Sequence, residues 1–180
     1  MGKIGAILLS GLMSAALVGC DSSETTGETV SKVGETDGSQ VSNEKENFKS
    51  YLADVRPVTQ DLSQFAKDFD TLRQESIDGE IDDLTFRSRV TEKFLPESVE
   101  MQEPIEQIIP PKELRNTHAK MIKMMAKNTE GLSEIISAID TGDASKITSA
   151  NNLMTETRTT AREYMYDLQD LADKYAVSLK

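Results

Sequence analysis

The side chains best suited to chemistry are a histidine and two methionines at helical spacing. His118 is the only histidine of the chain, and Met121 and Met125 follow it three and seven positions later. Residues at these separations share one face of a helix. Neutral imidazole and thioether sulfur bind copper(I) and haem iron, and helical bundles hold such ligands in their cores. The pattern therefore predicts a copper or haem carrier with His118, Met121 and Met125 as ligands.

The same stripe has a simpler interpretation. Methionine is a common core filler, and a histidine on an apolar face usually bonds to a facing side chain. Tyr51, Tyr164 and Asn128 are the partners we consider for such a bond. The sequence also has no Cys-x-x-Cys-His pattern for covalent haem, and our leading interpretation expects no cofactor.

A basic flank on the same segment is a second candidate site. It consists of Lys112, Arg115, Lys120, Lys123 and Lys127. In a chain with a net charge of −11, such a flank is suited to anionic headgroups, a wall polymer or an acidic envelope protein. The alternative is a solvated face whose cations pair with neighbouring glutamates.

Residue patterns of known catalytic sites are missing from the sequence. It contains one histidine and one cysteine, and it lacks Gly-x-Ser-x-Gly, a phosphate-binding loop and His-Glu-x-x-His. We therefore expect a protein that is not an enzyme. The acidic balance also argues against nucleic acid as a partner, because binding there depends on neutralising phosphates with lysine and arginine.

The first nineteen residues have the layout of an export signal. Lys3 precedes an apolar run at 4–18 that is interrupted by glycine and serine. The run falls short of the roughly 20 apolar residues of a membrane span, and its order of charge, apolar segment and small residues is that of a secretory signal.

This segment ends in Leu17-Val18-Gly19-Cys20, which resembles the lipobox of bacterial lipoproteins. The resemblance implies cleavage after Gly19 and attachment of diacylglycerol to Cys20, with palmitate-type chains that hold the protein on the extracytoplasmic face of the cell membrane. Two acyl chains give stable anchoring. Asp21 resembles the inner-membrane retention signal of enteric bacteria, and the sequence leaves open whether the envelope has one membrane or two.

Residues 20–43 are predicted to be the lipid anchor followed by a disordered acidic tether. Serine, threonine, glycine and acidic residues dominate this segment. It has too little apolar surface to offset the entropy lost on ordering its backbone.

Residues 44–180 are predicted to be a helical domain. Apolar residues recur every three or four positions in the ranges 44–77, 80–109, 111–140 and 144–177, the spacing of helices with one buried face. Pro57 should kink the first helix. Pro96 should either kink the second or begin a separate helix.

Short connections between these ranges predict an all-α fold, an antiparallel up-down four-helix bundle with kinked first and second helices. The residues Ile109-Pro110-Pro111-Lys112-Glu113-Leu114, then His118, then Gly142-Asp143 resemble small helical-bundle lipoproteins of Gram-positive, Bacillus-type bacteria. The resemblance covers the third and fourth helices. These families generally have no assigned activity, so the resemblance implies only a fold and a location.

The leading hypothesis is a membrane-tethered, non-enzymatic interaction or structural module of the cell envelope. Two alternatives stay open: the metal or haem carrier, and a small-molecule receptor with a pocket between helices. Asn128 and Thr157 interrupt apolar stripes, and they would either pair within the core or line such a pocket.

Overall fold

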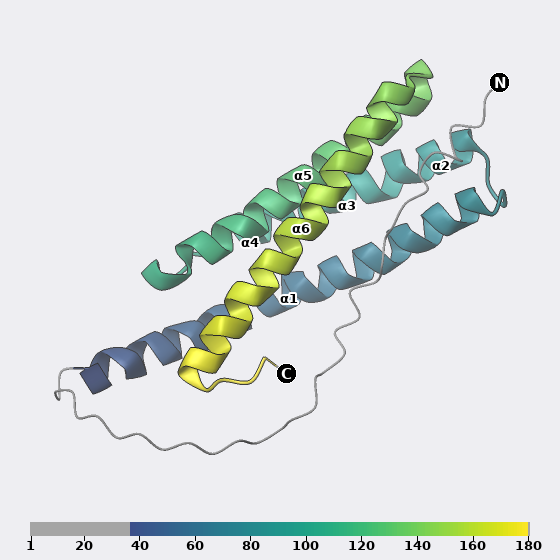
Figure 1. Cartoon of the computed structure of the whole chain (residues 1–180). Helices are drawn as coiled ribbons and strands as arrows, with labels where there is room; N and C mark the ends of the chain where they lie inside the picture. Colours follow the sequence, from purple (N-terminus) through teal and green to yellow (C-terminus); the bar gives the residue numbers. More distant parts are fainter. Residues whose placement is uncertain (1–36, 180) are drawn as a thin grey trace, which may run out of the picture.

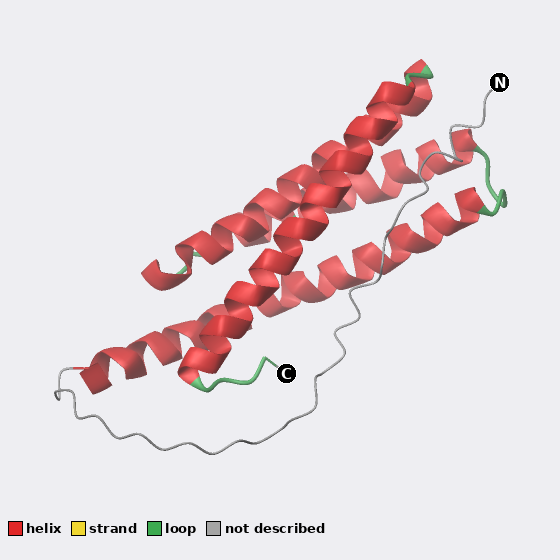
Figure 2. Ribbon diagram, in the orientation of Figure 1, coloured by secondary structure: helices red, strands yellow, loops and turns green. Residues whose placement is uncertain are grey.

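The computed structural model describes residues 37–179, with side chains from residue 40 onward. The described residues form helices joined by short turns and contain no strand (Figure 2). This confirms the predicted all-α class. The predicted signal at 1–19, Cys20 and the tether up to residue 36 lie outside the described residues.

Helix α1 (Asp37–Ile77) is the longest element. It begins before Glu44, where we expected the folded part to start, but residues 40–43 are exposed and Phe48 is the first buried side chain. The helix continues through Pro57, and the kink there stays a prediction. The stripe predicted to face inward is buried or half-buried along its whole length: Phe48, Tyr51, Val55, Val58, Leu62, Phe65, Phe69 and Leu72.

The second helical stretch is divided more finely than predicted. It consists of α2 (Asp83–Arg89), a π-helical turn η2 (Val90–Phe94), α3 (Leu95–Glu100) and α4 (Gln102–Gln107). Asp82 caps the start of α2 by accepting a hydrogen bond from the Thr85 backbone N–H at 2.8 Å.

Two prolines account for these divisions. Pro96 lies in the first turn of α3, and its ring cannot approach the carbonyl four residues earlier, so the turn before it widens. The backbone N–H of Leu95 accordingly bonds to Val90, five residues back. The run breaks again at Met101, just before the α4 segment that holds Pro104.

The last two helices are α5 (Arg115–Thr141), which follows a single 3₁₀ turn η3 (Lys112–Leu114), and α6 (Ala144–Tyr175). Gly142 takes the left-handed conformation that ends α5 (φ 67°). Asp143 then caps α6 by accepting a hydrogen bond from the Ser145 backbone N–H at 2.9 Å. Glycine and aspartate are residue types that favour these two positions.

Helices α5 and α6 lie side by side along their length, and α1 contacts α2, α4 and α6 (Figure 1). Two apolar clusters fill the interior. One surrounds Phe48, Tyr51, Met121 and Leu168. The other contains four phenylalanines, Phe65, Phe69, Phe86 and Phe94.

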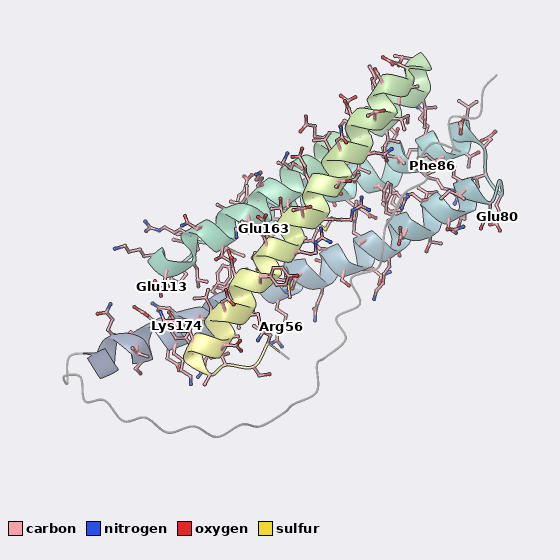
Figure 3. All side chains as sticks on the ribbon, in the orientation of Figure 1. Arg56, Glu80, Phe86, Glu113, Glu163 and Lys174 are labelled. Carbon is pink, nitrogen blue, oxygen red and sulfur yellow. The ribbon has the colours of Figure 1, made fainter. Side chains whose placement is uncertain are left out.

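The start of α1 and the end of α6 are joined by side-chain contacts. The Phe48 and Tyr175 rings lie 5.7 Å apart, and the Tyr175 hydroxyl donates to Glu44 at 3.0 Å. Lys174, labelled in Figure 3, pairs with the same Glu44 carboxylate at 3.2 Å. Arg87 in the last turn of α2 forms a two-pronged salt bridge with Asp140 in the last turn of α5.

Gly131 on α5 lies close to side chains of α6. A Cβ atom placed there would lie 2.8 Å from the Met154 methyl and 3.5 Å from the Leu153 Cβ. The methyl is the tip of a flexible side chain and can shift, whereas the Leu153 Cβ is fixed to the backbone.

We therefore expect Gly131→Ala to change the free energy of unfolding by less than about 1 kcal/mol, because the higher helix propensity of alanine offsets the shift of Met154. Gly131→Leu should lower it by about 1–3 kcal/mol through overpacking. Urea unfolding followed by circular dichroism measures both. An equal loss for the two variants would mean that a single methyl already separates the helices.

Candidate functional site

A polar layer crosses the apolar core at His118. The Tyr51 hydroxyl lies 3.3 Å from His118 Nδ1 and 3.5 Å from the Tyr164 hydroxyl. These three side chains come from α1, α5 and α6, and each is buried. The Tyr51 and His118 rings meet edge to face with centroids 5.8 Å apart. Tyr51 is thus the partner of His118, and the layer fixes three helices in register.

The other ring nitrogen of His118 is a buried polar atom without a hydrogen-bond partner among the described residues. Burial lowers the pKa of His118, and the nearby backbone carbonyl of Ile105 only partly opposes this. The ring is therefore neutral at pH 7. With the proton on Nε2, Nδ1 accepts a hydrogen bond from the Tyr51 hydroxyl. Burial also raises the pKa of both tyrosines, so neither ionises near neutrality.

The predicted sulfur ligands lie in the same apolar cluster as this layer. Met121 and Met125 are 0 % and 1 % exposed, and His118 is 4 % exposed. Within residues 37–179 no group of three or more histidine, cysteine, aspartate or glutamate side chains is arranged to hold a metal ion. The copper or haem site therefore stays a prediction that depends on one imidazole and the thioethers.

A second polar group joins α3 and α4 to α5. The Ser98 and Thr129 hydroxyls are 2.6 Å apart, Gln102 donates to Thr129 at 2.7 Å, and Asn128 donates to Ser98 at 3.1 Å. Asn128 therefore pairs here and not with His118. Thr157 donates to the Leu153 backbone carbonyl of its own helix at 2.9 Å. These polar residues satisfy one another and so act in packing.

The predicted basic flank faces α6 over part of its length. Lys120 pairs with Asp167 at 2.8 Å, and Lys127 pairs with Glu156. Lys127, and to a smaller extent Lys123, holds the pKa of Glu156 below its usual range. Lys112 and Arg115 are exposed and form no salt bridge within the described residues. The role of this flank in binding stays a prediction.

An open groove lies on the surface between α1 and α3–α4, and we call it the α1/α3 groove. Apolar side chains and carboxylates line it together: Val58, Asp61, Gln64, Phe65 and Asp68 from α1, and Glu97, Glu100, Met101 and Pro104 from the facing run. The sequence does not predict this groove. The sequence signal for the groove is a border of acidic residues beside each apolar stripe. An ordinary solvated helix face has the same pattern.

No described helix is both long enough and apolar enough to cross a membrane. Comparisons of the chain with protein-family models, with curated proteins and with solved structures find no match. The function must therefore be argued from the residues and their arrangement.

Proposed function

We propose that this protein is a lipid-anchored, non-enzymatic interaction module that holds a partner protein at the outer face of the bacterial cell membrane. The observation that carries the interaction role is the α1/α3 groove, a surface hollow with apolar side chains at its base and carboxylates along its edges. Apolar grooves between helices are common docking sites for polypeptides. The anchor rests on the lipobox-like Leu17-Val18-Gly19-Cys20.

The proposal includes the finer features of the fold. The helical rods α1, α2–α4, α5 and α6 form an antiparallel up-down bundle over residues 44–180, with bends at Pro57 and Pro96, and residues 20–43 connect it to the acylated cysteine. Short turns at 78–82, 108–111 and 142–143 support this arrangement. A rigid bundle on a polar tether can search for a partner within reach of the membrane.

The chemistry of the interior supports a binding role over catalysis. The His118 ring is neutral and enclosed, and its Nδ1 is engaged by Tyr51. The Ser98–Thr129 group is internally hydrogen-bonded. A general acid or base must reach a substrate proton, whereas these groups lie inside the packed helices. The groove is instead open to solvent, and its side chains can contact a second protein directly.

One experiment in cells tests the anchor and the groove together. A photoreactive amino acid replaces Gln64 in the groove or, as a control, Glu163 on α6 (Figure 3). Each is made with Cys20 intact and with Cys20→Ala. We expect labelled palmitate and membrane fractionation only with Cys20, because the alanine variant cannot be acylated, and a distinct crosslinked protein only from position 64.

Two results would contradict the proposal. Membrane retention of Cys20→Ala, with no lipid label on the intact protein, would remove the anchor. Identical crosslinks from positions 64 and 163 would remove the groove as the specific surface, because contact would then follow proximity in the envelope.

A further inference from the structure

The α1/α3 groove has the length and spacing of a helix-binding site. Its α1 wall is made by residues 58, 61, 64, 65 and 68, and its other wall by residues 97, 100, 101 and 104. Separations of three and four residues place the first set on one face of α1, and the second set lies across the junction of α3 and α4. The α1 wall runs from residue 58 to residue 68, ten steps along the helix, or about 15 Å of axis at about 1.5 Å per residue. This length matches about three helical turns of a ligand.

The floor and the rim of the groove differ in chemistry. The floor consists of Val58 and Phe65 from α1, which are 5 % and 7 % exposed, and of the more exposed Met101 and Pro104 from the facing run. Carboxylates follow both edges: Asp61 and Asp68 on one side, and Glu97 and Glu100 on the other. A ligand that fills this groove therefore needs an apolar stripe with charged flanks.

The rim has more negative charge than the described residues neutralise. Asp68 accepts hydrogen bonds from Lys93 at 3.0 Å and from Gln64 at 2.6 Å. Lys93 also interacts electrostatically with Glu97, so one lysine serves two of the four rim carboxylates. The side chains of Asp61 and Glu100 form neither a salt bridge nor a hydrogen bond within residues 37–179. Like charges that face each other across a groove repel, and cations placed between them relieve this repulsion.

We propose that the α1/α3 groove binds a basic, amphipathic α-helix of a partner protein. This inference rests on the proposed function and adds the chemistry of the partner. Leucine-like side chains at i, i+3, i+4 and i+7 would contact the floor, while lysine or arginine on both flanks would pair with the rim. The walls are helices whose backbone groups are already bonded, so they offer no edge to a β-strand. Anionic lipid headgroups would be repelled by the rim.

Peptide binding to the full-length Cys20→Ala chain tests the inference without a membrane. The probe is a fluorescent peptide of about 18 residues, or about five helical turns, with leucine at the spacing above and lysine on both flanks. A second peptide replaces every lysine with glutamate. The groove variant Asp61→Lys/Glu100→Lys is compared with Glu163→Lys/Asp170→Lys on α6. Both variants change the net charge equally, and all four side chains are exposed.

We expect the dissociation constant of the lysine peptide to be at least about tenfold higher for the groove variant than for the protein without these substitutions. The control variant should stay within about threefold of that protein. Binding should weaken as salt rises from about 0.05 to 0.5 M, because rim charges are screened. The glutamate peptide should not bind. Circular dichroism of each variant confirms that its helices are intact.

Four outcomes overturn the inference. Equal losses in both variants would show attraction to overall negative charge and not to the groove. Preference for the glutamate peptide would reverse the chemistry of the partner. A partner crosslinked in cells at position 64 through an acidic or non-helical segment would remove the inference and leave the proposed function intact. The absence of both a groove-specific crosslink and groove-dependent peptide binding would remove the inference and the proposed function together.

Discussion

Replacing Phe94 with alanine is expected to lower the free energy of unfolding by about 3–5 kcal/mol, a large share of the stability of a typical domain. Phe94 is 3 % exposed and ends the π-helical turn. Its ring packs edge to face against Phe65 at 5.4 Å and Phe69 at 5.2 Å. Alanine would leave a cavity lined by rings on α1. These rings cannot move in to fill the cavity, because α1 also packs against the rest of the protein on either side of them.

Leu84→Ala is the matched control for this prediction. Leu84 lies on α2 in the same helical run, but it is 71 % exposed, so its loss should change stability by less than about 0.5 kcal/mol. Urea unfolding of the Cys20→Ala chain, followed by circular dichroism, compares the two. A loss below about 1.5 kcal/mol for Phe94→Ala would show that the four-phenylalanine cluster collapses onto the cavity, and that it does not hold the second rod against α1.

Mild acid is expected to destabilise the protein through His118. In the folded state burial lowers the pKa of this histidine from its usual 6.5, so the unfolded chain binds a proton first. The stability due to the neutral ring is complete above pH 6.5 and is lost as the pH falls from 6.5 toward the lowered folded-state pKa. Between these two values the loss approaches about 1.4 kcal/mol per pH unit.

The variant His118→Gln isolates this effect because it removes the titrating group and keeps a hydrogen-bonding side chain. The protein with His118 should lose stability between pH 7 and pH 5. For the variant, the free energy of unfolding should stay nearly constant over the same pH range. Surface carboxylates do not confuse the comparison. Several have a lowered pKa because they accept hydrogen bonds, among them Asp68, Asp140 and Glu156. The stability that they contribute to the protein is therefore lost only at lower pH. Parallel slopes for the two proteins would exclude His118 as the source.

The sequence predicts elements whose signal is local. The stripes on α1, α5 and α6 repeat every three or four residues, and the burial of these residues follows the repeat. The caps at Gly142 and Asp143 are also local, because the conformation of the first and the carboxylate of the second determine where one helix stops and the next begins. The placement of His118 in the core follows from its position on such a stripe.

Features that depend on two segments meeting were not predictable in the same way. The bond between Ser98 and Thr129 joins residues 31 apart, and neither has a distinctive sequence pattern. The π-helical turn requires Pro96 and a following helix that stays packed, whereas proline alone indicates only an interruption. The α1/α3 groove forms where two acidic edges face each other, and a single chain pattern does not indicate which edges will meet.

The contacts between the two ends of the described chain have a mechanical consequence. Glu44 near the start of α1 is held by Lys174 and Tyr175 at the end of α6, and Phe48 packs on the Tyr175 ring one turn later. Any tension that reaches the bundle through the segment before α1 acts first on these contacts. It would peel α1 away from α6 one turn at a time, starting with an ion pair and an aromatic contact. The same few side chains therefore determine the force at which the bundle begins to open.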